Sequence, residues 1–483
     1  MNRIKRLTPL AWILLILVAC SATEKEVPKD KDKDTRQWLS GDHHIHSQYS
    51  VGWDREKTPW EPIIAGDAIY PIPTNAMMAK QFGLSWMVTT DHGGPNHSKI
   101  NLEMAYPELL QSRSEVSEVI QFYGMELDTP AGDHSSLIIP HTHDEADILH
   151  KLELGFDKWE VFPADPGRDT EDKMIEALSV MRALDSPPVV IANHPSRSAK
   201  AYGEYGLYHP AEFRRWNDTA PDVAVGMAGA PGHQAFALAN SPGIKSDDMR
   251  IRGGYRGYPT LGGFDQMTAR VGGFWDSMLG EGRRWWITAN SDSHQHYDEG
   301  GVDFWPGEYS KTYVYADRNH DSILSNLRAG HVFVTTGHLI DQLYVEVTNA
   351  NVSASIGDEI TVPVGSDVTI TIRLRDPTSP NPAGYDPSVN RVDLIMGDVT
   401  GISDDPSINS NSSTRVIKRF NSLDWKNEGE FITMSEVINV ERQHYVRVRG
   451  TNTDELEPTE DPAAENPWHD LWFYSNPVFI KTE

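Results

Sequence analysis

Residues 86–92 read Trp-Met-Val-Thr-Thr-Asp-His, so a short apolar run ends directly in two side chains that can bind a metal. The helix-like residues 75–82 precede this run, and Gly83 would end that helix. An apolar run of this length after an amphipathic helix is typical of a buried strand in a βα unit. The stretch therefore predicts an α/β fold in which the reactive side chains follow the strands.

The same succession of helix and strand continues through residues 39–337. Further apolar, β-prone runs are residues 120–123, 189–192 and 285–289. Amphipathic stretches precede the second and the third of these runs. Strands that alternate with helices over such a length pair in parallel, and we therefore expect a βα barrel or a doubly wound sheet.

The chain changes character at about residue 339. Residues 368–374 read Val-Thr-Ile-Thr-Ile-Arg-Leu and alternate between apolar and polar side chains. Similar alternation occurs at residues 343–347, 392–396 and 445–449, between turns rich in Gly, Pro, Asn and Asp. Strands of this kind predict a smaller antiparallel β-sandwich domain over residues 339–483.

Length, composition and charge narrow the class of protein. The 483 residues are 39% hydrophobic and 23% charged, which is enough for a sizeable core in two or three domains. The formal net charge of −27 argues against binding to polyanions through basic patches. We therefore expect a small-molecule substrate and no nucleic acid polymer, and we predict no protein partner.

The N-terminus has the features of a targeting segment. Basic residues open the chain, residues 7–19 are mostly apolar, and Leu17-Val18-Ala19-Cys20 resembles a bacterial lipobox. Cys20 is the only cysteine, so no internal disulfide can form. We predict a signal peptide at residues 1–20 with lipidation of Cys20, and the alternative is a plain secretory signal with an accidental cysteine.

Residues 21–37 are polar and charged and predict a flexible tether. Together with the lipid, this tether would place the protein outside the cytoplasm, anchored to a bacterial outer membrane and facing the periplasm or the cell surface. The lipid would be its only membrane contact, because the apolar run is too short for a comfortable span.

Side chains that bind metals gather directly after the predicted strands. His44 and His46 are separated by one residue, and on a strand such residues face the same way and can hold one ion. The other strand ends are Thr90-Asp91-His92, Gly124-Met125-Glu126 with the nearby Gly132-Asp133-His134, Asn193-His194-Pro195 and Asn290-Ser291-Asp292-Ser293-His294. A single HxH triplet is commonly accidental, but five such strand ends in succession are hard to attribute to packing.

The ordered set HxH, TDH, GxE, a following His, HP and SDxH resembles the PHP (polymerase and histidinol phosphatase) family over residues 39–337. The resemblance implies a distorted (β/α)7 barrel at residues 38–338 that binds two or three divalent ions. It further implies a first ion held by His44, His46, Glu126 and Asp292, a second held by Glu126, His134 and His194 with Glu126 bridging, and a third held in part by His92 and His294. Asp42 and Asp91 would not bind the metal themselves but would orient the imidazoles, a role that metal-bound histidines usually require of a neighbour. Imidazole and carboxylate ligands suit Zn, Mn or Fe.

One departure from the family pattern concerns the third ion. Members commonly place another His or Asp a few residues after HxH, where this chain reads Ser50-Val-Gly-Trp53. Asp67 has about the right spacing to the following helix, which suggests that residues 51–65 are an insertion and that Asp67 is the ligand. An equal alternative is that Asp67 is a turn residue.

The predicted ligands imply a hydrolytic reaction. Two ions that share a carboxylate would make a hydroxide available near neutral pH, so no serine or cysteine nucleophile is needed. The residues expected to be catalytic are His44, His46, Glu126, His194 and Asp292. Arg197 is a candidate for binding a substrate oxygen, or a surface arginine, and His233 is a candidate acid or substrate contact, or an ordinary loop histidine.

Hydrolysis of a phosphomonoester or phosphodiester is the expected function, because most of the family is associated with phosphate esters. The long secreted form also resembles the aryl carbamate hydrolase branch, so cleavage of an aryl carbamate or carboxylic ester on the same site is an alternative. A second alternative is a surface-binding lipoprotein without catalysis, in which the metals are structural.

Overall fold

A computed structural model describes residues 34–238, 251–255 and 260–483 of the chain. The predicted signal peptide, Cys20 and most of the predicted tether lie outside the described residues, so lipid anchoring stays a prediction. Residues Arg36–Glu483 form one compact unit. Among the described residues, no helix has both the length and the apolar character needed to cross a bilayer.

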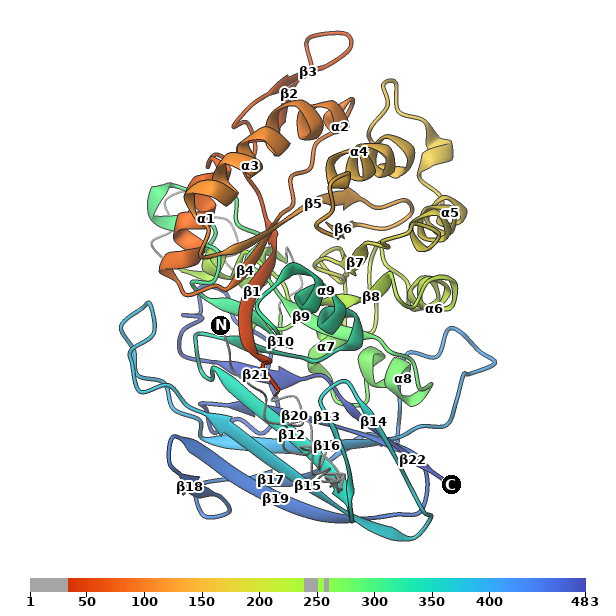
Figure 1. Cartoon of the computed structure of the whole chain (residues 1–483), viewed down its shortest axis with the longest axis vertical. Coiled ribbons are helices and arrows are strands. Elements are labelled where there is room, and N and C mark those ends of the chain that lie inside the picture. The colour runs from red at the N-terminus through yellow and green to blue at the C-terminus, as the bar shows by residue number, and fades with distance from the viewer. Residues whose placement is uncertain (1–33, 239–250, 256–259) are drawn as a thin grey trace, which may run out of the picture. The chain divides into compact units, whose positions relative to one another are not determined.

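A mixed sheet of fifteen strands dominates this unit (Figure 1). Its first half contains, in spatial order, β1 (Gln37–Ile45), β4 (Trp86–Thr89), β5 (Ile120–Asp128), β6 (His134–Ile139), β7 (Val189–Ala192), β8 (Ala224–Ala230) and β9 (Trp286–Ala289). The pairs β1–β4–β5 and β7–β8–β9 are parallel. Every residue of β4, β7 and β9 is buried, as expected for strands covered on both faces.

Strand β6 corrects the expectation of uniformly parallel pairing, because it runs antiparallel to both β5 and β7. The physical reason is the short turn at residues 129–133, since a connection of this length can only form a hairpin. Beyond β9 the chain returns to the first strand, where Ile45 forms a parallel bridge with Ser293. The start and the end of the predicted metal-binding region therefore meet.

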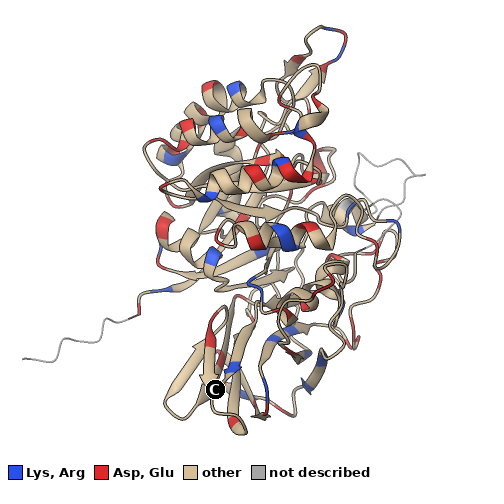
Figure 2. Ribbon diagram, turned by 90° about the vertical axis from the view of Figure 1, so that its right-hand side faces the viewer, with Lys and Arg blue, Asp and Glu red and all other residues tan. Residues whose placement is uncertain are grey.

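Helices flank the strands, and α4, α5 and α6 lie in succession along one side of the sheet (Figure 1). The helices are α1 (Ile72–Gln81), α2 (His97–Ile100), α3 (Tyr106–Glu115), α4 (Glu145–Phe156), α5 (Glu171–Arg182), α6 (Pro210–Thr219), α7 (Gln266–Ala269), α8 (Phe274–Gly280) and α9 (His320–Ala329), and the π-helix η1 (Asn101–Ala105) joins α2 to α3. Helix α9 shows local control of its ends, because Asn319 caps its first turn and Gly330 ends it with a left-handed backbone. Acidic and basic residues are interspersed along the outer helices (Figure 2).

The C-terminal region contains a separate antiparallel sheet of five strands. Its order is β13 (Val352–Ser355), β12 (Gln342–Asn349), β15 (Ser366–Arg375), β19 (Phe431–Val440) and β18 (Lys426–Glu428). Alternate residues of β15, including Ile370 and Ile372, are buried and belong to one hydrophobic cluster with Leu394 and Val448 of the large sheet. The alternation seen in the sequence thus separates a buried face from an exposed one.

The large sheet continues from the metal-binding region into the C-terminal region. Its remaining strands are β10 (Ser310–Ala316), β11 (Val332–Thr336), β14 (Glu359–Val362), β16 (Arg391–Asp398), β17 (Arg415–Phe420), β20 (His444–Thr451), β21 (Trp472–Ser475) and β22 (Val478–Thr482). Strand β21 pairs with β11, with Val334 opposite Tyr474, and it also pairs with β20. One hydrogen-bonded ladder therefore crosses the predicted boundary at residue 338. A small hairpin, β2 (Gly52–Asp54) and β3 (Glu61–Ile63), lies within residues 51–65.

Candidate metal centre

Four buried side chains meet at the end of β1. The Nε2 atoms of His44 and His46 lie 2.9 Å apart, because the two residues are on the same side of the chain. His44 Nε2 lies 2.9 Å from Oε1 of Glu126 and 3.1 Å from Oδ1 of Asp292. His46 Nε2 lies 3.1 Å from the same Asp292 oxygen. Together these residues form a four-ligand cluster able to hold one ion.

Glu126 also belongs to a second cluster, with His134 and His194. Its Oε2 lies 3.1 Å from Nδ1 of His134, and its Oε1 lies 3.2 Å from Nε2 of His194. His134 is the first residue of β6, yet it reaches the same edge as the carboxyl ends of the parallel strands because β6 runs in the opposite direction. Glu126 is thus placed between two groups of imidazoles.

A third group contains His92, His294 and Asp67. Asp67 Oδ2 lies 3.1 Å from Nε2 of His92 and 3.3 Å from Nε2 of His294. The hairpin of residues 51–65 closes below Asp67, where a side chain on Gly66 would come within 2.7 Å of the Gly52 nitrogen. Glycine at this close approach lets the chain return to the cluster after the hairpin. Among the described residues, the side chains whose ligand atoms converge here are His46, His92 and His294, so Asp67 as a metal ligand stays a prediction.

Glu126, Asp292 and His46 have the charge states of metal ligands, whereas His134 does not. Burial would lower the pKa of His134, but Glu126 raises it well above its usual value, so a cation would have to displace the proton of His134. Burial alone would raise the pKa of Glu126, but the facing His134 and His44 hold it well below its usual value. Burial would likewise raise the pKa of Asp292, but His233 and His44 hold it well below the usual range. Burial and the neighbouring His294 lower the pKa of His46 well below its usual value. Ionised carboxylates beside a neutral imidazole are the states that bind a cation.

The backbone at the cluster is strained. His194, His233 and Asp292 have φ values of 30°, 60° and 49°, in the left-handed region that favours glycine. Such a conformation costs of order 1–3 kcal/mol per residue and persists only where the surrounding structure fixes it. Three such residues around one cluster indicate that the fold holds their side chains in position at the expense of a strained backbone.

Asp42 and Asp91 support the cluster differently from the expectation. Neither orients an imidazole directly: Asp42 accepts the amides of His44 (3.0 Å) and Ser291 (3.1 Å) and so joins β1 to the segment after β9. Asp91 accepts from the Ser50 hydroxyl (3.0 Å), which itself lies 2.8 Å from Nδ1 of His46. The correction has a simple cause, since a buried carboxylate first satisfies the nearest backbone and hydroxyl donors.

Sequence reasoning missed Asp303. His233 lies between two carboxylates: its Nε2 is 2.6 Å from Asp292 Oδ2, and its Nδ1 contacts Asp303 Oδ1. Asp303 is buried and its other oxygen accepts the amides of His294 (2.8 Å) and Gln295 (3.2 Å). The residue follows no strand, so no pattern in the sequence pointed to it. Asn193 was also missed, although it adjoins His194 and donates to Glu126 Oε1 at 3.0 Å.

A cavity of about 440 Å³ opens over the three groups of ligands. Arg197 and His233, the two predicted substrate contacts, both line it. Nη2 of Arg197 donates to Oδ1 of Asp133 at 2.6 Å, so the guanidinium is fixed at the cavity wall. The structure thus brings together all of the side chains predicted as ligands or substrate contacts among the described residues.

Divalent cations fit this site. A neutral imidazole carries one N–H, so His44 Nε2 cannot donate to Glu126 and Asp292 together while also facing the His46 nitrogen. The Nδ1 atom of His44 is buried without a hydrogen-bond partner within the described structure. No hydrogen bond at Nδ1 therefore fixes the orientation of the His44 ring. A cation among these atoms would satisfy all four ligands, and the N and O donor set suits Zn, Mn or Fe.

No protein-family model matches the chain, and no curated protein matches it. Two solved structures resemble it weakly. One is an endonuclease Q complex with a 27-mer duplex carrying an abasic lesion (TM-score 0.29, 13% identity), and the other is the lesion-specific endonuclease PfuEndoQ of Pyrococcus furiosus (TM-score 0.29, 16% identity). Each match covers 61% of this chain and 56% of the other, so the chain spans little more than half of their length.

The expectation that no nucleic acid polymer is involved does not stand, and one of the two similar structures is itself a complex with duplex DNA. That expectation was based on the net charge of −27. Net charge describes the average surface, and bound cations can reverse the local charge of a cavity. The overall charge is therefore not a valid ground for excluding a polyanion.

Proposed function

We propose that this chain is a metal-dependent hydrolase of the PHP type that cleaves a phosphate ester. The observation that carries the proposal is the position of Glu126, whose two oxygens face His44 and His194 on one side and His134 on the other. A carboxylate shared by two groups of imidazoles is the arrangement that a two-metal hydrolase needs. The order of the motifs along the chain agrees with this family.

The ions would be held by three groups of side chains. The first is His44, His46, Glu126 and Asp292, and the second is Glu126, His134 and His194. The third is His92 and His294, which lie near His46 and which Asp67 contacts. Bound divalent ions supply a hydroxide near neutral pH and neutralise charge on a phosphoryl oxygen.

The chain's own residues position the ester. Arg197 is at the cavity wall, where its guanidinium can bind a phosphoryl oxygen while Asp133 fixes its direction. Burial would lower the pKa of His233, but Asp292 and Asp303 raise it well above its usual value. Both ring nitrogens of His233 contact carboxylates, so it has no free N–H to donate, but its position at the cavity wall lets its positive charge stabilise negative charge on the departing oxygen.

A substrate screen tests the proposal. The full chain, loaded with Zn²⁺, Mn²⁺ or Fe²⁺, is assayed side by side on phosphomonoesters, phosphodiesters and aryl carbamates. We expect turnover of phosphate esters that a chelator abolishes and that Asp292→Asn reduces by at least about a hundredfold, since an essential charged group is lost. The exposed Asp298→Asn is the matched control.

Two results would contradict the proposal. If the protein hydrolyses carbamates and no phosphate ester, the bond that the site cleaves is the carbamate bond and not a phosphate ester bond. Full metal occupancy without turnover of any ester would favour a binding protein with structural metals. Circular dichroism of Asp292→Asn separates loss of chemistry from loss of fold.

A further inference from the structure

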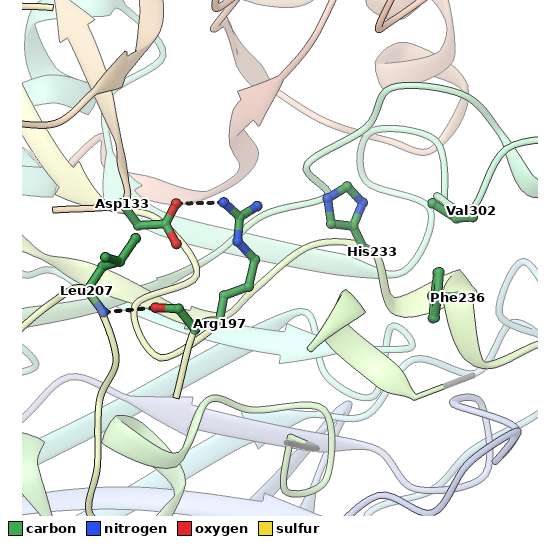
Figure 3. A pocket seen from close by; sticks show the side chains of 7 residues that line it. Asp133, Arg197, Leu207, His233, Phe236 and Val302 are labelled. Carbon is green, nitrogen blue, oxygen red and sulfur yellow. Dashed lines mark hydrogen bonds and ion pairs between the residues drawn. The ribbon is translucent and has the colours of Figure 1, made fainter. Parts of the chain in front are cut away.

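A second cavity, of about 550 Å³, shares lining residues with the one above the metal ligands, and Figure 3 shows the residues of this second cavity. Its lining residues are Asp133, Arg197, Ser198, Leu207, His233, Phe236 and Val302. Arg197, His233 and Val302 line both cavities, so the two lie side by side. The second cavity is therefore within reach of a molecule whose reacting bond lies at the metal ligands.

The walls of the second cavity are apolar on two sides. Leu207 lies on one side, and Phe236 and Val302 lie on the other, as Figure 3 shows. Leu207 is 53% exposed although it faces the cavity, so a ligand seated there would remove apolar surface from water. Several apolar side chains that line a cavity together with a few placed polar groups are typical of a ligand pocket.

The polar side chains of the lining already have partners, and those of His233 are Asp292 and Asp303 outside the lining. Arg197 and Asp133 form an ion pair of 2.6 Å, and the two charges offset each other. The hydroxyl of Ser198 accepts the amide of Leu207 at 2.8 Å. An uncharged apolar group can therefore enter this space without breaking a charge pair, whereas a charged group would have to compete with one.

We propose that Leu207, Phe236 and Val302 form a specificity pocket for an apolar substituent, such as an aryl ring, on the ester that the metal centre cleaves. The inference rests on the proposed function and names the substrate class: small esters whose organic group is hydrophobic. A cavity of this volume lies in the range that holds a ligand of drug size, and one aromatic ring fits easily within it.

Binding of two phosphonates tests the pocket without relying on turnover. Phenylphosphonate and methylphosphonate share the group that faces the metals and differ in the apolar part. We expect the metal-loaded full chain to bind phenylphosphonate about tenfold more tightly in calorimetry, since apolar contacts give discrimination of this order. The cationic 2-aminoethylphosphonate should show no such gain over methylphosphonate.

Two variants locate the effect. Leu207→Trp fills the pocket from an exposed position, and Phe236→Ala removes one of its walls; both should bring the ratio of the two affinities towards one. Leu423→Trp, at a position 93% exposed and outside the lining, should leave the ratio at its original value. Because Leu207 is half exposed, its replacement tests the pocket even if Phe236→Ala fails to fold.

The outcomes distinguish this inference from the proposed function. Equal affinity for the two phosphonates in the unaltered protein, or an unchanged ratio in both variants, would overturn the pocket even if phosphate esters are hydrolysed. A retained preference for phenylphosphonate that both variants reduce would support the pocket even if no ester is turned over.

Discussion

The Nε2 atom of His233 lies 2.6 Å from Oδ2 of Asp292, so a loop histidine is tied to a carboxylate that also faces His44 and His46. Asp303 contacts the other nitrogen of the same ring. Asp292 and Asp303 from the connection after β9, with His233 from the segment after β8, thus form one row that ends at the metal centre. The row fixes which oxygen of Asp292 faces the imidazoles of the cluster, and Asp303 acts through His233 as a positioning residue.

Asp303→Asn is expected to weaken metal binding. The amide cannot match the charge that holds His233, so Asp292 loses its fixed orientation, and losses of this kind typically cost about 10–100-fold in affinity. Titration of the metal-free protein with Zn²⁺ measures the change, and the exposed Asp298→Asn in the same loop is the control. An unaltered affinity would show that the row has no part in holding the metal.

Glu126→Gln is expected to remove more metal than His194→Asn. Glu126 belongs to two of the clusters, whereas His194 belongs to one of them. Metal counted per chain by mass spectrometry should therefore fall by two ions in the first variant and by one in the second. Glu118→Gln, whose side chain is 57% exposed, is the control. Equal losses in the two cluster variants would argue against a shared carboxylate.

Asp67→Ala is expected to remove one ion per chain, because its carboxylate joins His92 to His294. The same metal count gives the answer, with the exposed Asp185→Ala for comparison. If the count is unchanged, Asp67 is a turn residue and the third group does not bind through it.

A pH-dependent contribution to stability is expected from His97 and Glu153. His97 Nδ1 lies 2.6 Å from Glu153 Oε1, and both side chains are 1% exposed. Burial would lower the pKa of His97, but Glu153 raises it to about 9. Because the pKa is higher in the folded state than the ordinary 6.5, this stabilisation is fully present below about pH 6.5 and is lost as the pH rises through about 9.

The measurement compares the free energy of unfolding in urea for the unaltered protein and for His97→Gln. The difference between the two should shrink by about 3 kcal/mol from pH 6 to pH 9.5, as a rise of this size in the pKa implies. His143→Gln, at a side chain 95% exposed, controls for the general effect of pH. A difference that stays constant or grows would contradict the assignment.

The convergence of the metal ligands could be predicted because it depends on strand order. His44 and Glu126 lie in the last residues of β1 and β5, His92 and Asp292 follow β4 and β9, and the carboxyl ends of neighbouring parallel strands share one edge of the sheet. The sequence shows this order, because a strand-like run precedes His92, Glu126 and Asp292 within a few residues.

Other features depend on long-range contacts that leave no local pattern. The antiparallel direction of β6 follows from a five-residue turn that sequence reasoning did not weigh, and it is this direction that brings His134 to the site. Asp303 lies in a loop and reaches the site only through contacts that form in the folded chain, with His233, His294 and Gln295. The partners of Asp42 and Asp91 likewise depend on which donors the fold brings nearest.

The pairing of β21 with β11 has a consequence for biosynthesis. The amide of Ile287 in β9 donates to the side chain of Asn476 at 2.9 Å, so the strand that leads to Asp292 is held by a residue made much later. While the nascent chain is still short of residue 472, β11 would present a bare edge open to adventitious strand pairing. The sheet that carries the metal-binding side chains therefore lacks one of its edge pairings until the C-terminal strands have been made.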